Sequence, residues 1–208
     1  MILVHHLRIG RSVFTVWLLE ELGLDYELKL YDRNEMGRAP PELREAHPLG
    51  KSPVIEIDGQ TLAESGAIAM YLTEYYDPNN TLAPAPDDKA ARLRWLQWLH
   101  YSEGSAFAPL LIKMLLMRET AAGGTGSPLL GMFSEGEVAL QLGYMQDFLG
   151  DKQFVLGDTL QAPDIGFTYI AAMADRIGIL GDYPQLKAYI DRNMSRPAFL
   201  RAAERTGG

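Results

Sequence analysis

The sequence changes character near residue 77, and this change limits the possible folds more than any other feature. Before it, segments that alternate apolar and polar residues are interleaved with segments of helical period, in the order β-α-β-α-β-β-α. After it, the periodic segments all indicate helices. A strand, a crossover helix and a second strand form a parallel pair. The sequence therefore predicts a small α/β domain followed by an all-helical domain.

A stretch rich in Pro, Asn and Asp, "DPNNTLAPAPDD" at 77–88, is typical of a linker. We expect a first domain over residues 1–78, a linker over 79–88 and an all-helical domain over 89–208. Three further expectations concern the helical part. They are a bend near Pro109, a glycine-rich loop over "AAGGTGSPLLG" and a break between two short helices at Pro197.

The composition excludes several kinds of function. The chain has no cysteine, so any thiol chemistry must use a thiol that arrives with the ligand. Its net charge of −8 disfavours nucleic acid as a partner, although helix N-termini and local cations can still bind a small anion. Membrane-length apolar runs and a signal-peptide pattern are absent, so we expect a cytoplasmic protein. His5 and His6 face opposite sides of one strand, and no metal site is expected.

The stretch "LGKSPVIEIDGQTLAESG" contains a hairpin that turns at Asp-Gly and opens on Pro53. Since proline cannot donate to a sheet, Pro53 has two interpretations. It is a trans proline on an edge strand, or it follows a cis bond that turns the backbone of Ser52 outward to bind an extended peptide. Glu64 and Ser65 also have two interpretations. Ser65 caps the next helix, or the pair binds an amino-acid head group together with the first helical N–H groups.

Three segments of the first part resemble the N-terminal domain of glutathione S-transferases: "HHLRIGRSVFTVWLLEELGLDYEL", "RAPPELREAHPLG" and "HPLGKSPVIEIDGQTLAESGAIAMYL". They are most similar to the fungal and bacterial branch that carries SR followed by WLLEEL. In the helical part, "GDTLQAPDIGF" is similar to the family's GD-x-L-T-x-A-D segment. The resemblance implies a thioredoxin-like domain followed by a helical one. It also implies glutathione as co-substrate, a small hydrophobic electrophile as second substrate, and a homodimer without metal.

The resemblance also assigns roles in binding glutathione. A cis Pro53 would present the backbone of Ser52 to the cysteinyl part, and Glu64 with Ser65 would hold the γ-glutamyl end. Lys51 would meet the glycyl carboxylate. Arg38 or Arg44 would assist on that flank, unless both are only solvated surface arginines.

The sequence departs from the family at the position that usually carries a catalytic serine, which here is Gly10. The remaining candidates for stabilising a thiolate are Ser12, Arg11 and the N–H groups at the start of the first helix. Ser12 has a second interpretation as the helix N-cap. A further departure is Gln161, a poor cap at the family's threonine position, where Asp164 would complete the capping box.

For the electrophile, the resemblance points to the helix after the linker, where Tyr101, Phe107, Met114 and Met117 are candidates for an apolar pocket. Packing in the helical core is the alternative for each of them. The expected function is conjugation of glutathione to small hydrophobic electrophiles. Two other functions remain open: a non-catalytic glutathione-binding protein, and a cysteine-free, glutathione-dependent disulfide reductase or peroxidase.

Overall fold

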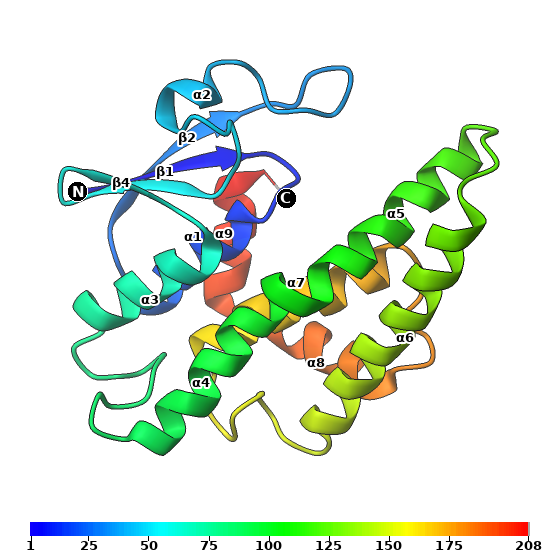
Figure 1. Cartoon of the computed structure of the whole chain (residues 1–208). Coiled ribbons are helices and arrows are strands. Elements are labelled where there is room, and N and C mark those ends of the chain that lie inside the picture. The colour runs from blue at the N-terminus through cyan, green and yellow to red at the C-terminus, as the bar shows by residue number, and fades with distance from the viewer. Residues whose placement is uncertain (208) are drawn as a thin grey trace. The chain divides into compact units, whose positions relative to one another are not determined.

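In the computed structural model, which describes residues 1–207, all strands precede residue 64 and helices form the rest (Figure 1). The chain divides into two units, residues 1–83 with the segment from Met194 onward, and residues 84–193. The first unit holds β1 (Ile2–Leu7), α1 (Ser12–Leu22), β2 (Tyr26–Tyr31), α2 (Leu43–Ala46), β3 (Val54–Ile57), β4 (Gln60–Ala63), α3 (Ser65–Tyr75) and α9 (Pro197–Thr206). The second holds α4 (Lys89–Tyr101), η1 (Ser102–Ala106), α5 (Phe107–Ala121), α6 (Pro128–Leu149), α7 (Ala162–Arg176) and α8 (Pro184–Met194).

The sheet of the first unit has the strand order β2-β1-β3-β4. β1 and β2 are parallel, whereas β3 and β4 form an antiparallel hairpin that adds to the other side of β1. This arrangement confirms the predicted topology. Both faces of β1 are covered, so His5 and His6 are both buried, although they point to opposite faces. His5 contacts Tyr31 and Glu56, each at 2.8 Å.

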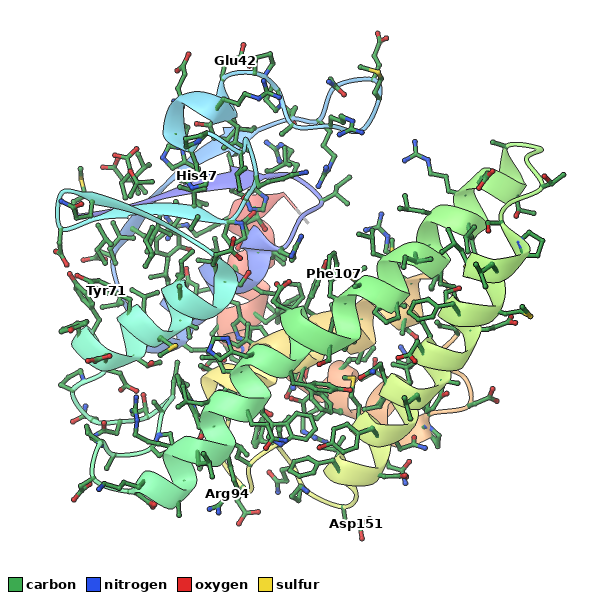
Figure 2. All side chains as sticks on the ribbon, in the orientation of Figure 1. Glu42, His47, Tyr71, Arg94, Phe107 and Asp151 are labelled. Carbon is green, nitrogen blue, oxygen red and sulfur yellow. The ribbon has the colours of Figure 1, made fainter. Side chains whose placement is uncertain are left out.

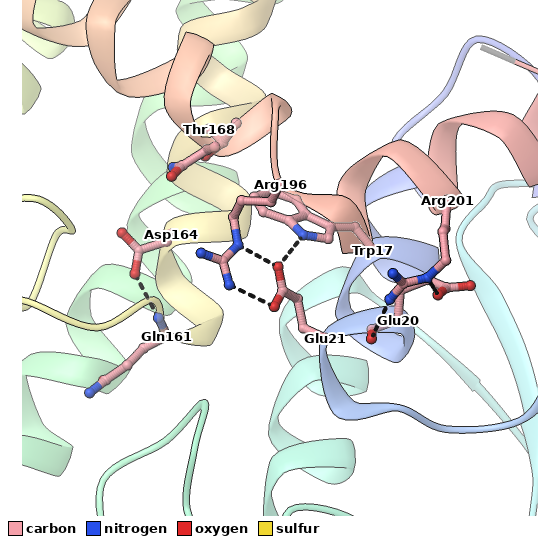
Figure 3. A network of polar contacts seen from close by, with 9 residues as sticks. Trp17, Glu20, Glu21, Gln161, Asp164, Thr168, Arg196 and Arg201 are labelled. Carbon is pink, nitrogen blue, oxygen red and sulfur yellow. Dashed lines mark hydrogen bonds and ion pairs between the residues drawn. The ribbon is translucent and has the colours of Figure 1, made fainter.

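The C-terminal helix α9 packs against α1, which explains why it belongs to the first unit and not to the predicted helical domain over 89–208. Trp17 is fully buried and its ring meets that of Phe199 edge-on, with centroids 5.3 Å apart. Beside this contact, Arg196 donates to both oxygens of Glu21, at 2.6 and 2.9 Å, and the Trp17 indole N–H donates to the same carboxylate (Figure 3). A bidentate, partly buried pair of this kind is stronger than an exposed one.

A π-helix, η1, separates α4 from α5. The irregularity ends at Ala106, three residues before Pro109, near which the sequence predicts a bend. Proline lacks an N–H and its ring clashes with the carbonyl four residues earlier, so the preceding turn cannot stay α-helical. The glycine-rich loop is shorter than predicted, because α6 already begins at Pro128, where the side chain of Ser127 accepts from Leu130 N–H.

The helical unit is built around α7, whose first turn carries the buried Asp164. One oxygen of this carboxylate accepts from Val155 N–H at 2.8 Å and Tyr189 O–H at 2.6 Å, and the other from Gln161 N–H at 2.8 Å. Figure 3 shows the contact with Gln161. Within residues 1–207, the buried Oε1 of Gln161 has no hydrogen-bond partner. Gln161 and Asp164 thus occupy the two positions of the capping box, and the Asp164 side chain accepts from Gln161 N–H as predicted. Among the described helices, none is long and apolar enough to cross a bilayer.

Candidate functional site

The strand register of the first unit brings three segments of the candidate site to one edge of the sheet. His5 pairs with Val54, and Val54 pairs with Ala63. The residues that follow β1, those that precede β3 and those that follow β4 therefore leave the sheet at the same edge. Since β2 is parallel to β1, the residues that follow β2 leave it there too. Segments 8–12, 32–38, 51–53 and 64–66 meet at this edge.

The peptide bond between Ser52 and Pro53 is cis, which confirms that prediction. The Ser52 hydroxyl donates to His5 O at 2.8 Å and accepts from Leu7 N–H at 3.3 Å, so it fastens the segment to β1. A ligand contact from Ser52 would consequently come from its backbone, as the sequence leads us to expect. The neighbouring Lys51 side chain is exposed.

Glu64 occupies the N-cap position of α3, and Ser65 is the first helical residue. The interpretation of Ser65 as the N-cap is therefore wrong by one position. Glu64 has a positive φ of 74°, which is uncommon for a residue other than glycine. Its side chain makes no capping hydrogen bond within the described part of the chain. The first N–H groups of α3 have no intrahelical acceptors, so the helix start suits a ligand carboxylate.

Ser12 is the first residue of α1, and Arg11 precedes it as the N-cap residue. The Ser12 side chain has 0% exposed surface, and its hydroxyl shares a hydrogen bond of 2.9 Å with His6 Nδ1. The interpretation of Ser12 as the N-cap is wrong, because Arg11 holds that position. As a candidate for stabilising a thiolate, Ser12 has its hydroxyl buried beneath the helix and bonded to a histidine. Burial, with a smaller effect from Arg8, lowers the pKa of His6 to about 4, so this imidazole is neutral at pH 7.

Gly10 cannot carry a side chain in this backbone. A Cβ atom at this position would lie 2.7 Å from the carbonyl oxygen of Leu7. Real Cβ atoms do not approach a backbone oxygen so closely, so any larger residue would have to move the turn. The departure from the family's serine is therefore built into the local geometry. Arg11, which is partly buried, and the N–H groups at the start of α1 remain as the groups that could stabilise an anion here.

Two arginines flank the edge. Arg38 is exposed and ends a loop that Asn34 holds closed, with the Asn34 side-chain oxygen accepting from the N–H groups of Met36 and Arg38 at 3.1 and 2.9 Å. The side chain of Arg44 lies against Gly50, next to Lys51. Within residues 1–207, no three His, Asp or Glu side chains form a group that could hold a metal ion.

The residues expected to form an electrophile pocket all lie in the helical unit. Tyr101 donates to Gln141 Oε1 at 2.6 Å, and burial raises the pKa of Tyr101 far above the ordinary value, so the hydroxyl stays protonated. Phe107, at the start of α5, lies partly exposed beside Tyr169, with ring centroids 6.0 Å apart (Figure 2). Met114 is partly buried and Met117 is 42% exposed.

The sequence alone assigned no role at the candidate site to two nearby residues, His6 and Arg33. His6 matters because Ser12, six residues later, turns back onto it at the start of α1. Arg33 lies in the turn after β2 and donates to the backbone of the β1–α1 turn. The sequence predicted that β1 and β2 pair in parallel, so the residues after β2 were expected beside the residues after β1. The available signal for Arg33 was therefore its position just after β2.

The family model described as "Glutathione S-transferase, N-terminal domain" matches residues 1–74. Glutathione S-transferase 3 of Schizosaccharomyces pombe is 32% identical over 99% of this chain and 88% of its own length. A glutathione S-transferase structure from Actinobacillus pleuropneumoniae is similar to 100% of this chain and 94% of its own, with 34% identity and a TM-score of 0.88. A sphingomonad glutathione S-transferase complexed with glutathione covers 99% of this chain and 98% of its own, with 25% identity and a TM-score of 0.79. The chain belongs to the glutathione S-transferase family.

Proposed function

We propose that the chain binds glutathione at the sheet edge and transfers it to small hydrophobic electrophiles. The observation that carries this proposal is the strand register, which brings the cis Ser52–Pro53 segment, the start of α3 and the start of α1 to one edge. Each of these three features can recognise a different part of a tripeptide. The sphingomonad relative that was solved with glutathione supports the same choice of ligand.

In this proposal, the backbone of Ser52 pairs with the cysteinyl residue of glutathione as one strand pairs with another. The first N–H groups of α3 with Ser65 take the carboxylate of the γ-glutamyl end, and Glu64 takes its ammonium. Lys51 with Arg38 or Arg44 neutralises the glycyl carboxylate. An acidic ligand thus meets local cations although the whole chain carries a net charge of −8.

The cysteinyl sulfur then lies near the start of α1. A free thiol has a pKa of about 8.5, so it is mostly protonated at pH 7, and a helix N-terminus with a nearby cation favours the reactive thiolate. The thiol proton passes to solvent, and the sulfur forms a bond to an electrophilic carbon. A leaving group departs with its bonding electrons, or the electrons move into a conjugated acceptor that water then protonates. We assign the electrophile to apolar side chains of the helical unit, among them Tyr101, Phe107 and Met114.

A glutathione-dependent disulfide reductase or peroxidase is the second candidate. The observation that favours it is the absence of cysteine together with the absence of a side chain at Gly10. Bound glutathione would supply the only thiol. Its thiolate attacks one sulfur of a disulfide, forms a mixed disulfide with it and displaces the other sulfur as a thiolate. We further propose that the protein acts in the cytoplasm as a homodimer, as relatives of this fold lead us to expect.

Binding is tested by titration calorimetry and thermal unfolding with glutathione. At a ligand concentration near 100 times Kd, the ligand should stabilise the wild type by about 2.7 kcal/mol. Glu64→Gln and Ser65→Ala should each weaken binding, whereas Glu74→Gln, which changes an exposed glutamate on the same helix, should not. If glutathione neither binds nor raises Tm, the proposed ligand is wrong. Side-by-side assays with a chloronitrobenzene and with a small mixed disulfide then decide between conjugation and disulfide reduction.

A further inference from the structure

The turn between β1 and α1 contains a strained residue. Ile9 has a φ of +55°, in the left-handed region, and its side chain is 61% exposed. A β-branched residue rarely adopts this conformation, because its Cβ crowds the following carbonyl oxygen. Strain of this kind persists only where the surrounding structure holds it, and it is frequent at ligand sites. Ile9 directly precedes Gly10 and the start of α1.

Arg33 holds this turn from the end of β2. Its Nε donates to Arg8 O at 3.0 Å and its Nη2 donates to Ile9 O at 2.9 Å. One planar guanidinium thus binds the two carbonyls that flank the Ile9 Cα. Its Nη1 donates to Gly37 O at 2.9 Å, in the loop that carries Arg38. The fixed fork of a guanidinium suits three such contacts, whereas the single ammonium of lysine does not. Arg33 thus connects two of the segments at the sheet edge.

The same guanidinium lies beside Gly10. A Cβ atom on Gly10 would be 3.4 Å from Arg33 Nη2, on the side of the turn where a larger residue would project. The other charged groups of this turn include Arg11, the N-cap residue of α1, and the pair formed by Arg8 and Asp32, whose Nε and Oδ1 are 2.9 Å apart. The delocalised positive charge of this exposed arginine therefore lies beside the position where Leu7 O leaves no room for a side chain. It adds to the partial positive charge of the α1 N-terminus.

We propose that Arg33 is the positioning residue of the sulfur site. It holds the Ile9 turn so that the first N–H groups of α1 face the ligand sulfur, and its charge favours the thiolate at a site without a side-chain hydroxyl. This inference rests on the proposed binding of glutathione at the sheet edge. A nearby cation lowers a thiol pKa, whereas it has little effect on a neutral thioether in the same place.

The test compares wild type with Arg33→Met, Arg33→Lys and a control, Arg94→Met, which changes an exposed arginine of α4. The readouts are the thiolate absorbance of bound glutathione against pH, and calorimetric affinities for glutathione and S-methylglutathione. Arg33→Met should raise the pKa of the bound thiol by about one unit. At pH values below that pKa, the conjugation rate should fall about tenfold, because the thiolate fraction falls by the same factor. Arg33→Lys should raise the thiol pKa less. Affinity for S-methylglutathione should stay within about threefold, since a thioether does not ionise.

A second variant guards against loss of the fold. Ile9→Gly removes the strain, because glycine adopts positive φ freely, so the double variant Ile9→Gly/Arg33→Met should fold and still show the raised thiol pKa. An unchanged thiol pKa in Arg33→Met, a wild-type thiol pKa in the double variant, or an equal loss of affinity for both ligands would each overturn the assignment. Failure of the proposed function looks different: the wild type itself would then bind neither ligand, and the assignment of Arg33 would fall with it.

Discussion

The Ser12 hydroxyl lies 2.9 Å from His6 Nδ1, and both side chains are buried between β1 and the first turn of α1. From the sequence, Ser12 could stabilise either the fold or a ligand thiolate, and this contact favours the structural role. The Ser12 hydroxyl serves the fold, and in the proposed function thiolate stabilisation would come from backbone N–H groups and cations.

Ser12→Ala should therefore reduce stability more than rate. The substitution leaves His6 Nδ1 buried without its partner, which costs about 1–3 kcal/mol. The conjugation rate should change by less than about tenfold, since loss of a direct oxyanion-type donor costs about 10² or more. Urea unfolding and steady-state kinetics on one preparation measure both effects. A rate loss above a hundredfold at unchanged stability would restore Ser12 as the donor.

The pH dependence of stability should carry a contribution from His6. Its folded pKa of about 4 lies below the unfolded value of 6.5, so the unfolded chain binds the proton more readily. This contribution is fully present above pH 6.5 and is lost as the pH falls toward 4. Asp164 acts in the opposite direction, because burial raises its folded pKa to about 6.

The His6 contribution is isolated by comparing wild type with His6→Asn, because Asp164 titrates in both. The stability difference between the two proteins should be largest above pH 6.5 and shrink as the pH falls to about 4. Denaturant unfolding at several pH values measures it. A difference that stays constant across this range would mean that His6 does not titrate as described.

Gly10→Ser should not produce a more active enzyme, although it introduces the serine that the family resemblance implies at this position. Its Cβ would lie 2.7 Å from Leu7 O, so the turn held by Arg33 would have to move. We expect a destabilisation of about 1–3 kcal/mol and no gain in rate. Gly143→Ser on α6, where an added Cβ meets nothing within 4 Å, is the control for a helical glycine with space. A Gly10→Ser protein with wild-type Tm and a higher rate would contradict this reading of the turn.

Asp164→Ala should be the most damaging of these substitutions. It leaves three donors, Val155 N–H, Gln161 N–H and the Tyr189 hydroxyl, without their acceptor inside the helical unit. The expected loss is about 3–5 kcal/mol, against less than about 0.5 kcal/mol for the exposed Asp151→Ala. Asp164→Asn should fall between them. Equal Tm values for the alanine variants would show that the network contributes little.

The sequence predicted the sheet topology because the alternation before residue 64 and the Asp-Gly turn are local signals, and chain connectivity then leaves few ways to pair the strands. The cis bond before Pro53 was expected from the family resemblance, because a proline at the start of a strand by itself leaves both a trans and a cis bond open. The membership of α9 in the first unit could not be predicted from the sequence. It depends on the contacts of Trp17 with Phe199 and of Glu21 with Arg196, which lie about 180 residues apart and have no local pattern.

The sulfur site shows the same limit. The sequence shows that Gly10 lacks a side chain, but only the structure shows that a Cβ atom there would clash with Leu7 O. Nor could the sequence place Arg33, because an arginine after a strand is most often a solvated surface residue. The role of Arg33 depends on the positive φ of Ile9. A β-branched residue rarely adopts positive φ, so nothing in the sequence predicts this conformation.

A crystal structure with bound glutathione would show whether the tripeptide lies along this sheet edge with its sulfur at the start of α1. We expect a cysteinyl backbone paired with that of Ser52, and a sulfur within about 3.5 Å of a backbone N–H in the first turn of α1. A sulfur directed away from α1, or glutathione bound elsewhere on the protein, would disprove the proposed binding site.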